Sequence, residues 1–288
     1  MMAPAQARRL GDGRLHLQHG PIDLIIEAWG APDAVADAYC RAARRFDTVL
    51  TELVAELPLL RAVGAAPTGV IACRMARAVA PFRPTFITPM AAVAGAVAEE
   101  ILASLVGPGI LKAYVNNGGD IAVHLGPFQS LTCAMAEGQG SLTLSGQDTA
   151  RGIATSGWGG RSWSFGIADA VTVVARTAAM ADGAATMIAN AVDLPGHPAV
   201  TRRPANTLQA DTDLGDRLVT TAVGLLSDTD IARALAAGLA AAEAFRARGL
   251  IDAAALFLHS SCRVSGPHFL GTHLPGTHSL PAREPAYV

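Results

Sequence analysis

Residues 112–125 read KAYVNNGGDIAVHL, and this stretch constrains the fold more than any other part of the chain. Two apolar runs, at 113–115 and 121–125, flank a turn made of Asn, Gly and Asp. Because Asn and Gly tolerate positive φ, the pattern predicts two strands joined by a tight turn. The turn holds two amides, two glycines and a carboxylate, which are more polar groups than a hairpin turn needs. It therefore has two interpretations, an ordinary hairpin turn and the floor of a binding site.

Helical and strand-like patterns are mixed along the chain. Apolar residues recur every three to four positions over 33–57, which predicts a long amphipathic helix that ends near Pro58. A helix over 91–106 is expected to follow a cap at Thr88, and its Gly95 would let another backbone approach closely. Other helices are expected at 70–79, 177–192 and 228–248, and strands at 15–18, 22–28, 111–115, 121–125, 131–136, 142–144, 170–175 and 253–259.

The order of these elements lacks a strict βαβ alternation, which favours an α+β fold over a doubly wound sheet. The strand at 253–259 is expected to be the last one. Residues 152–156 are interpreted as the approach to a glycine-rich loop, and 197–216 as a polar loop. Neither a linker nor a repeat interrupts the pattern. A single domain is therefore predicted over 1–265, followed by a Gly-, Pro- and His-rich tail over 266–288.

Composition excludes several classes of protein. The net charge of −2 and the pI of about 6.4 do not suggest a nucleic-acid partner. No stretch of about 18 residues lacks both charges and turn formers, so no membrane span is expected. Nor does an apolar run follow the basic N-terminus, so we expect a cytoplasmic protein. Alanine-rich helices suggest a broad core or a homo-oligomer interface, and four well-separated cysteines suggest reduced thiols.

A second polar stretch, GIATSGWGGRSWSFG, spans residues 152–166. Arg161 lies in its middle as a partner for phosphate or carboxylate. Glycines around it would allow close backbone approach, and two tryptophans could flank a planar ligand. The alternative is a surface loop without function. The groups concerned are the hydroxyls of Thr155, Ser156, Ser162 and Ser164, the glycines Gly157, Gly159 and Gly160, and the indoles of Trp158 and Trp163.

A third stretch, MADGAATMIANAVD over 180–193, places Asp182 and Thr186 four residues apart, on one face of a helix. A carboxylate and a hydroxyl presented together suit Mg²⁺, which takes water and phosphate oxygens as its other ligands. Taken alone, this spacing is common in helices that bind no metal. His268, His273 and His278 are interpreted as part of a solvated tail and not as a metal site.

The order and spacing of VNNGGDI, GIATSG, AVTVVA and ADGAAT resemble the ApbE superfamily of flavin transferases. Those enzymes carry an N-x-GG-[DN]-I turn, an A-[TV]-SG loop, a VTV strand and a helix with A-D-x3-T. More closely, TPMAAVAGAVAEEIL, NNGGDIAVHL and GIATSGWGGRSWSFGIADAVTVVA are similar to the UPF0280 branch of that superfamily. The likeness to UPF0280 covers about 15–265, whereas the likeness to ApbE enzymes is confined to roughly 88–192.

This resemblance implies an ApbE-like, T-fold-like architecture of mixed or antiparallel sheets with flanking helices. In ApbE enzymes FAD lies in a cleft between the sheets, Mg²⁺ bridges its pyrophosphate, and FMN passes to a Thr or Ser hydroxyl. Carried over by position, Asp182 and Thr186 would be the metal ligands. The flavin pocket would be formed by Asn117, Gly118, Gly119 and Asp120, with Asn116 beside them, and bordered by Thr155, Ser156, Gly157 and Arg161.

The sequence also departs from the ApbE pattern. ApbE enzymes carry an H-x-x-DP-x-TG segment after the SG loop, but here only residues 158–168 separate Gly157 from Asp169. The lysine of the family's KG helix is replaced by Ala94. Arg161, Ser162 and Ser164 would then face whatever replaces the missing segment, and the first two are the candidate catalytic residues.

The leading hypothesis is a cytoplasmic ApbE-like protein that binds a flavin nucleotide, FAD or FMN, or a similar ring-plus-phosphate ligand. With Mg²⁺ it would catalyse phosphoryl or nucleotidyl transfer, whereas standard FMN transfer is doubtful without the missing segment. One alternative is an enzyme that binds a pterin or another one-carbon cofactor, because a pterin shares the fused pyrimidine edge of a flavin. Another is a non-catalytic ligand-binding module.

Overall fold

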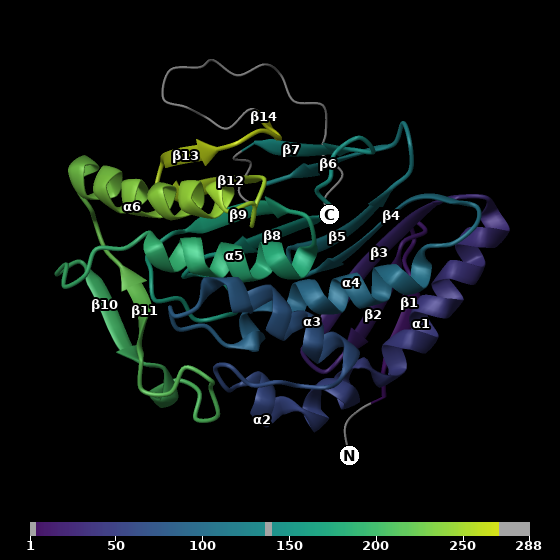
Figure 1. The fold of residues 1–288 in the computed structure, drawn as a ribbon, viewed down its shortest axis with the longest axis horizontal. Helices are drawn as coiled ribbons and strands as arrows, with labels where there is room; N and C mark the ends of the chain where they lie inside the picture. Colours follow the sequence, from purple (N-terminus) through teal and green to yellow (C-terminus); the bar gives the residue numbers. More distant parts are fainter. Residues whose placement is uncertain (1–3, 136–139, 271–288) are drawn as a thin grey trace.

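The computed structural model describes residues 4–135 and 140–270, and within these ranges nine strands form one antiparallel sheet (Figure 1). The strand order is β1-β2-β3-β4-β5-β8-β9-β12-β13, so most neighbours in sequence are neighbours in the sheet. The bounds are β1 (Gln6–Arg9), β2 (Leu15–His19), β3 (Ile22–Gly30), β4 (Ile110–Asn117), β5 (Asp120–Leu125), β8 (Gly152–Ser156), β9 (Ala170–Ala175), β12 (Ala253–Leu258) and β13 (Ser261–Ser265).

Helices cover one face of this sheet, and a second, smaller sheet covers part of the other. The helices are α1 (Pro32–Ala55), α2 (Leu57–Leu60), α3 (Val70–Val79), α4 (Val93–Leu105), α5 (Ala178–Ala191) and α6 (Asp228–Ala247). The smaller sheet contains β14 (Phe269–Leu270), β7 (Ser141–Ser145) and β6 (Ser130–Ala134) in that order. A separate pair is formed by β10 (Val200–Pro204) and β11 (Leu218–Val223). The predicted α+β class is confirmed.

Side chains that alternate in direction along the central strands explain why the sheet is covered on both faces. In β4, Ala113 and Val115 pack into the core under the helices, whereas Tyr114 belongs to the core beneath the small sheet. In β5, Ala122 faces the helices and Val123 the small sheet. Successive side chains of a strand point to opposite faces, so a strand covered on both sides is apolar throughout. The central part of the sheet is therefore buried between two layers.

Helix boundaries follow local chemistry, with two corrections to the predictions. Pro58 does not end α1 but lies in the first turn of α2. In that position a backbone N–H has no partner within the helix, so a proline, which has no N–H, costs no hydrogen bond. Thr88 does not cap α4, because a 3₁₀ turn, η2 (Pro89–Ala92), intervenes and the Thr88 hydroxyl donates to Asp213. By contrast, Thr177 caps α5 by accepting from the Met180 N–H.

Several predicted connections are strands. Residues 152–156, interpreted as the approach to a loop, form β8 in the middle of the main sheet. The predicted loop at 197–216 contains β10 and a 3₁₀ turn, η4 (Ala205–Thr207). The strand β12 is not the last, because β13 pairs with it and β14 pairs with β7. The predicted tail thus contributes β14, while residues 271–288, including His273 and His278, lie outside the described residues.

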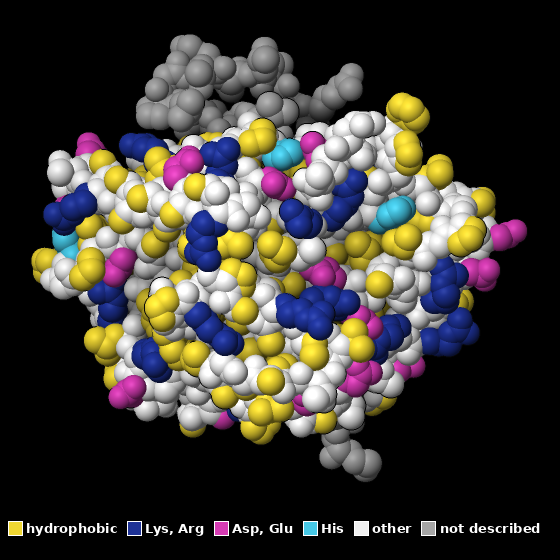
Figure 2. Space-filling model, viewed as in Figure 1, with side chains coloured by type: hydrophobic (Ala, Val, Ile, Leu, Met, Phe, Trp, Pro, Cys, Tyr) yellow, Lys and Arg dark blue, Asp and Glu magenta, His cyan; other side chains and the backbone are white. Residues whose placement is uncertain are grey.

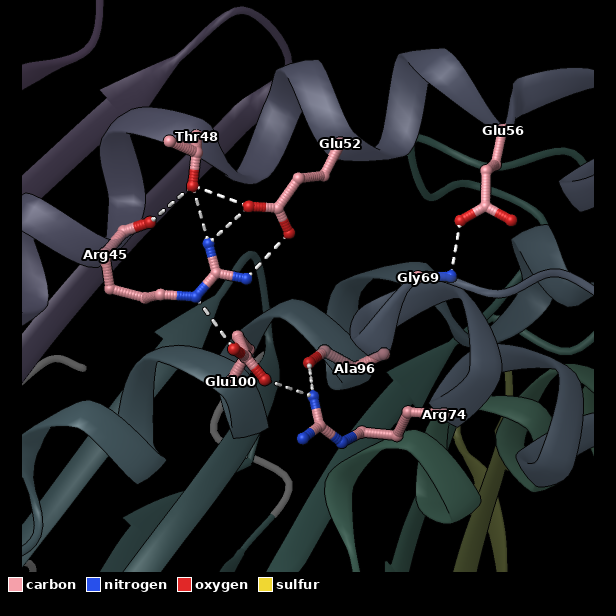
Figure 3. A network of polar contacts seen from close by, with 8 residues as sticks. All are labelled: Arg45, Thr48, Glu52, Glu56, Gly69, Arg74, Ala96 and Glu100. Atoms are coloured by element: carbon pink, nitrogen blue, oxygen red, sulfur yellow. Dashed lines mark hydrogen bonds and ion pairs between the residues drawn. The ribbon is translucent and has the colours of Figure 1, made fainter.

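A network of ion pairs joins three of the helices (Figure 3). Arg45 of α1 donates from Nε to Glu100 of α4 at 2.8 Å, and its Nη2 lies 2.8 Å from Glu52. Arg74 of α3 donates from Nη1 to the same Glu100 at 3.0 Å and to the Ala96 carbonyl at 3.1 Å. Because Glu100 is mostly buried, both guanidinium groups hold α4 in register with its neighbours.

Two further predictions concern the whole chain. Within the described part of the chain, no helix is both long and apolar enough to span a membrane. All four cysteines are free thiols, as predicted, with Cys133 and Cys262 buried and Cys40 exposed.

Candidate functional site

The Asn-Gly stretch is a true hairpin, and its tip lies beside α4. Asn117 and Asp120 close the β4–β5 pair around Gly118 and Gly119, whose φ angles are +65° and +108°. Both glycines thus occupy the left-handed conformation that a two-residue hairpin requires. Asn116 Oδ1 accepts from the Gly119 N–H at 2.8 Å. Asn117 is buried and donates from Nδ2 to the Ala94 carbonyl at 3.1 Å, which ties the hairpin to α4.

Strand β8 forms the next wall of the site. The Thr155 N–H donates to Asp120 Oδ1 at 3.2 Å, and the Thr155 hydroxyl lies 2.9 Å from that of Thr172 on β9. At the end of β8, a side chain on Gly157 would collide with the Asp169 carbonyl, so only glycine fits there. Ser156 is half-buried at the same end of the strand. The predicted border of the pocket therefore lies next to its predicted floor.

Helices α4 and α5 cap each other across a close contact. Asp182 of α5 accepts at Oδ2 from the Gly95 N–H in the first turn of α4, at 3.0 Å. Glu99 of α4 accepts at Oε1 from the Ala179 N–H in the first turn of α5, at 2.7 Å. Each carboxylate thus meets the positive end of the other helix. A side chain at Gly95 would collide with the Ala178 carbonyl, which confirms the predicted close backbone approach.

Two carboxyl groups meet between this helix pair and the hairpin. Burial raises the pKa of Asp182 to about 7, an effect that the N–H groups of Gly95 and Ala94 oppose. Burial also raises the pKa of Asp120 well above its usual value, and the negative charge of Asp182 raises it further. Two such neighbours cannot both ionise without a compensating charge. The pair therefore favours either a bound proton or a nearby cation.

Arg161 is the cation next to this pair. A side chain at Gly118 would collide with Arg161 Nη2, so the guanidinium lies directly over the hairpin tip. The charge of Arg161 lowers the pKa of Asp120, against the effect of burial. Among residues 4–135 and 140–270 the guanidinium has no hydrogen-bond or ion-pair partner, and the residue is exposed. Its donors are thus available to a ligand.

The rest of the 157–169 connection is held by the protein. Trp158 donates from Nε1 to Asp169 at 3.0 Å, so its indole N–H is already bonded. Ser164 is buried and donates to Asn190 of α5 at 2.9 Å. Ser164 was expected, with Arg161 and Ser162, to face whatever replaces the missing segment, but its hydroxyl is bonded to Asn190 instead. Ser162 is exposed and Trp163 half-buried.

The donor set suits a hard cation that keeps several ligands of its own. Asp182 and the half-buried Thr186 lie one turn apart on α5, and Asp120 faces Asp182 from β5. Within the described ranges, no three His, Cys, Asp or Glu side chains form a metal-binding cluster. A metal here would therefore complete its shell with water, carbonyl or ligand phosphate oxygens, as Mg²⁺ commonly does. Sequence reasoning missed Glu99 and Thr172, which have no motif of their own.

Comparison with known proteins agrees with the predicted family. A family model described as "AbpE bacteria" matches residues 6–265. The UPF0280 protein of Methanococcoides burtonii is 41% identical over 120 residues, which cover 40% of this chain and 49% of that protein. The UPF0280 protein of Methanothermobacter thermautotrophicus is 41% identical over 115 residues, covering 38% and 44%. The chain thus matches about half the length of these curated relatives.

Among solved structures, the apo form of the Pseudomonas stutzeri flavinyl transferase ApbE aligns over 92% of this chain and 96% of that one. The sequence identity is 15% and the TM-score is 0.39, a value too low to carry an argument. The family rests instead on the model match over 6–265 and on the relatives at about 40% identity. The chain belongs to the AbpE bacteria family and is similar to the UPF0280 proteins, as its ApbE-like motifs predicted.

Proposed function

We propose that this protein binds a flavin nucleotide, FAD or FMN, at the tip of the β4–β5 hairpin, with Mg²⁺ held by Asp182 and Thr186. The observation that carries the proposal is the half-buried pair of Asp120 and Asp182 close to the guanidinium of Arg161, which has no hydrogen-bond or ion-pair partner among the described residues. A carboxylate pair that needs a cation and an arginine that needs an anion are together complementary to a metal–phosphate unit. The likeness of these motifs to ApbE enzymes supports a flavin as the ring that accompanies the phosphate.

Each residue has a definite part in this proposal. Asp182 would hold the metal as a carboxylate, and the Gly95 N–H orients its Oδ2. Asp120 would add its negative charge from β5, and the Thr155 N–H orients its Oδ1. Arg161 donates to a phosphate oxygen over the hairpin tip. When bound, Mg²⁺ offsets phosphate charge and assists phosphoryl or nucleotidyl transfer.

The transfer of FMN to a protein hydroxyl is not part of the proposal. The connection between β8 and β9 is short, and its second half is anchored to α5 through Ser164 and through the Ile167 N–H, which donates to the Val192 carbonyl at 2.8 Å. Only residues 159–163 are free to serve a reaction. Arg161 and Ser162 are therefore the candidate catalytic residues, and ligand binding comes first among the properties to test.

The test is a binding titration of the purified chain with FAD, FMN and a pterin, each with and without Mg²⁺, followed by flavin fluorescence and calorimetry. We expect Mg²⁺ to tighten FAD binding in the wild type but not in Asp182→Ala. Asp37→Ala, an exposed change on α1, is the matched control. The absence of any flavin response with or without Mg²⁺ would refute the proposal. Tighter binding of the pterin than of the flavins would favour the one-carbon alternative. If Asp182→Ala binds FAD with the same affinity as the wild type, the non-catalytic binding module would be favoured.

A further inference from the structure

A cavity of about 340 Å³ lies at the end of β5 opposite the hairpin tip and at the start of α5, five residues before Asp182. It is lined by His124 near the end of β5 and by Thr177 at the start of α5, whereas Asp120 and Asp182 belong to the site already described. His124 lies four positions after Asp120 along the strand, which is roughly 13 Å. The cavity shares Ala122, Val123 and His124 with the second strand of the hairpin, but its arginines Arg151 and Arg176 belong to none of the motifs discussed above.

Two guanidinium groups of the cavity, those of Arg151 and Arg176, form no ion pair within the described residues, although the charge of Asp148 acts on Arg151. Arg151 donates to the backbone carbonyls of Asp148, Ala150 and Gly146 at 2.5, 2.6 and 3.2 Å. Three of its five N–H donors are thus used, and two remain. Arg176 is exposed, and within residues 4–135 and 140–270 it has neither a hydrogen bond nor an ion pair. These two cations are available to an anion.

The remaining charged groups of the cavity are already paired. Glu99 accepts from the Ala179 N–H and lies 3.1 Å from Arg74 Nε, so both its oxygens are occupied. Arg74 is further held by Glu100 and by the Ala96 carbonyl, as Figure 3 shows. Three guanidinium groups therefore face a single carboxylate in this cavity.

His124 adds little to this positive charge. Burial lowers its pKa, and the charge of Arg151 lowers it further, so the neutral imidazole is favoured. On the face drawn in Figure 2, Lys and Arg side chains lie on either side of the place where the start of α5 meets α4 in Figure 1, with Asp or Glu side chains between them.

The cavity also has an apolar wall, which limits the kind of anion it suits. Its lining includes Leu102 and Ala103 of α4, Val106 directly after that helix, and Ala122 and Val123 of β5. A bare inorganic ion would leave this wall uncovered. Pockets for drug-sized ligands have volumes of roughly 300–1,000 Å³, so this one suits a compact molecule with a single ring or short chain.

We propose that this cavity binds a small organic phosphate, with the phosphate between Arg151 and Arg176 and the apolar part against α4. A phosphate monoester carries nearly two negative charges at neutral pH, which matches two guanidinium groups that keep free N–H donors within the described residues. The proposal does not depend on flavin binding, because it uses neither the hairpin tip nor the carboxylate pair.

The probe is phenyl phosphate, and its binding to the full chain is measured by isothermal titration calorimetry. Phenol and inorganic phosphate, which represent the two halves of this molecule, are titrated separately for comparison. We expect phenyl phosphate to bind more tightly than either half. Arg176→Gln should weaken it about tenfold, the effect of losing one charge-assisted hydrogen bond. The variant is exposed and removes no internal bond, so it should fold normally. Arg44→Gln on α1, equally exposed and unpaired, should leave binding unchanged.

Three results would overturn the proposal: no heat from phenyl phosphate, equal binding of phenol, or equal weakening by Arg44→Gln. Asp182→Asn separates the two sites. If it abolishes phenyl phosphate binding while Arg176→Gln does not, the phosphate binds at the hairpin and the cavity proposal is wrong. If FAD fails to bind while phenyl phosphate binds as expected, the flavin proposal fails and this one stands.

Discussion

Replacing Asp182 by Asn should stabilise the metal-free protein at alkaline pH. Burial raises the pKa of this carboxyl from 3.8 to about 7. Well below pH 3.8 the group is protonated in both the folded and the unfolded chain, so its titration does not change the free energy of unfolding. As the pH rises to 7 the unfolded chain releases this proton while the folded chain keeps it, so the free energy of unfolding falls. A shift of about three pH units corresponds to a loss of about 4 kcal/mol above pH 7.

The Asn variant does not titrate, and its amide oxygen can still accept from the Gly95 N–H. Its advantage over the wild type should therefore grow by about 2 kcal/mol between pH 5.5 and pH 8, the part of the titration that falls in this window. Urea unfolding at both pH values measures the difference. Millimolar Mg²⁺ should stabilise the wild type at pH 8, because a cation compensates the ionised Asp182 carboxylate, and should leave Asp182→Asn unchanged.

Asp37→Asn removes the same charge from an exposed position on α1 and is the control for net charge. Its effect should be the same at both pH values. If Asp182→Asn and the wild type differ equally at pH 5.5 and pH 8, the carboxyl does not titrate between them. The argument that Asp182 and Asp120 need a compensating cation would then be wrong.

Two glycine substitutions test the geometry of the site. Gly118→Ala and Gly119→Ala both place a side chain at positive φ, at about 1 kcal/mol each, but only Gly118→Ala collides with Arg161. We expect FAD affinity to fall in Gly118→Ala alone, and an equal fall in both would show that backbone strain, and not Arg161, controls binding. Gly95→Ala should lower the free energy of unfolding by about 2 kcal/mol in urea titrations, because its Cβ meets the Ala178 carbonyl. A loss below about 0.5 kcal/mol would contradict the close α4–α5 contact.

Elements with a clear apolar period were predictable from the sequence. The predicted bounds of the helix at Val70–Val79 and the strand at Ala170–Ala175 coincide with the observed ones. The helix buries one face and shows the helical period, whereas the strand is almost entirely apolar because cores on both sides of the sheet bury it. The single domain, the homo-oligomer and the cytoplasmic location stay predictions, which limited proteolysis, size-exclusion chromatography and cell fractionation can test.

The elements that were missed have a different physical origin. Strand β10, with the sequence VTRRP, carries two arginines and alternates between exposed and half-buried positions. Its partner β11 begins 14 residues after β10 ends, so the pairing has no local signal. The strand exists because that partner satisfies its backbone groups and not because its side chains fill a core. Such a strand cannot be distinguished from a polar loop by hydrophobic pattern alone.

The same distinction applies to the candidate site. Family motifs identified Asp120 and Asp182, and the structure brings these two groups together from β5 and α5. Glu99 was not identified, because its role depends on the Ala179 N–H, 80 residues away in the chain. Ser164 was misassigned for a similar reason, since its hydroxyl is bound by Asn190. Motifs find the groups that a site needs, but only the fold shows which of them are already bonded.

The motif residues of this chain serve the fold as well as the pocket. Asn117 anchors the hairpin to α4, Asp182 caps α4, and Gly118 supplies the φ that the turn requires. Selection for a stable fold alone would keep all three, whatever the protein binds. Arg161 has no such bond within the described residues, so nothing in the fold requires it. A difference in activity between relatives with the same hairpin should therefore be sought at residues 159–163, where sequence changes leave the architecture intact.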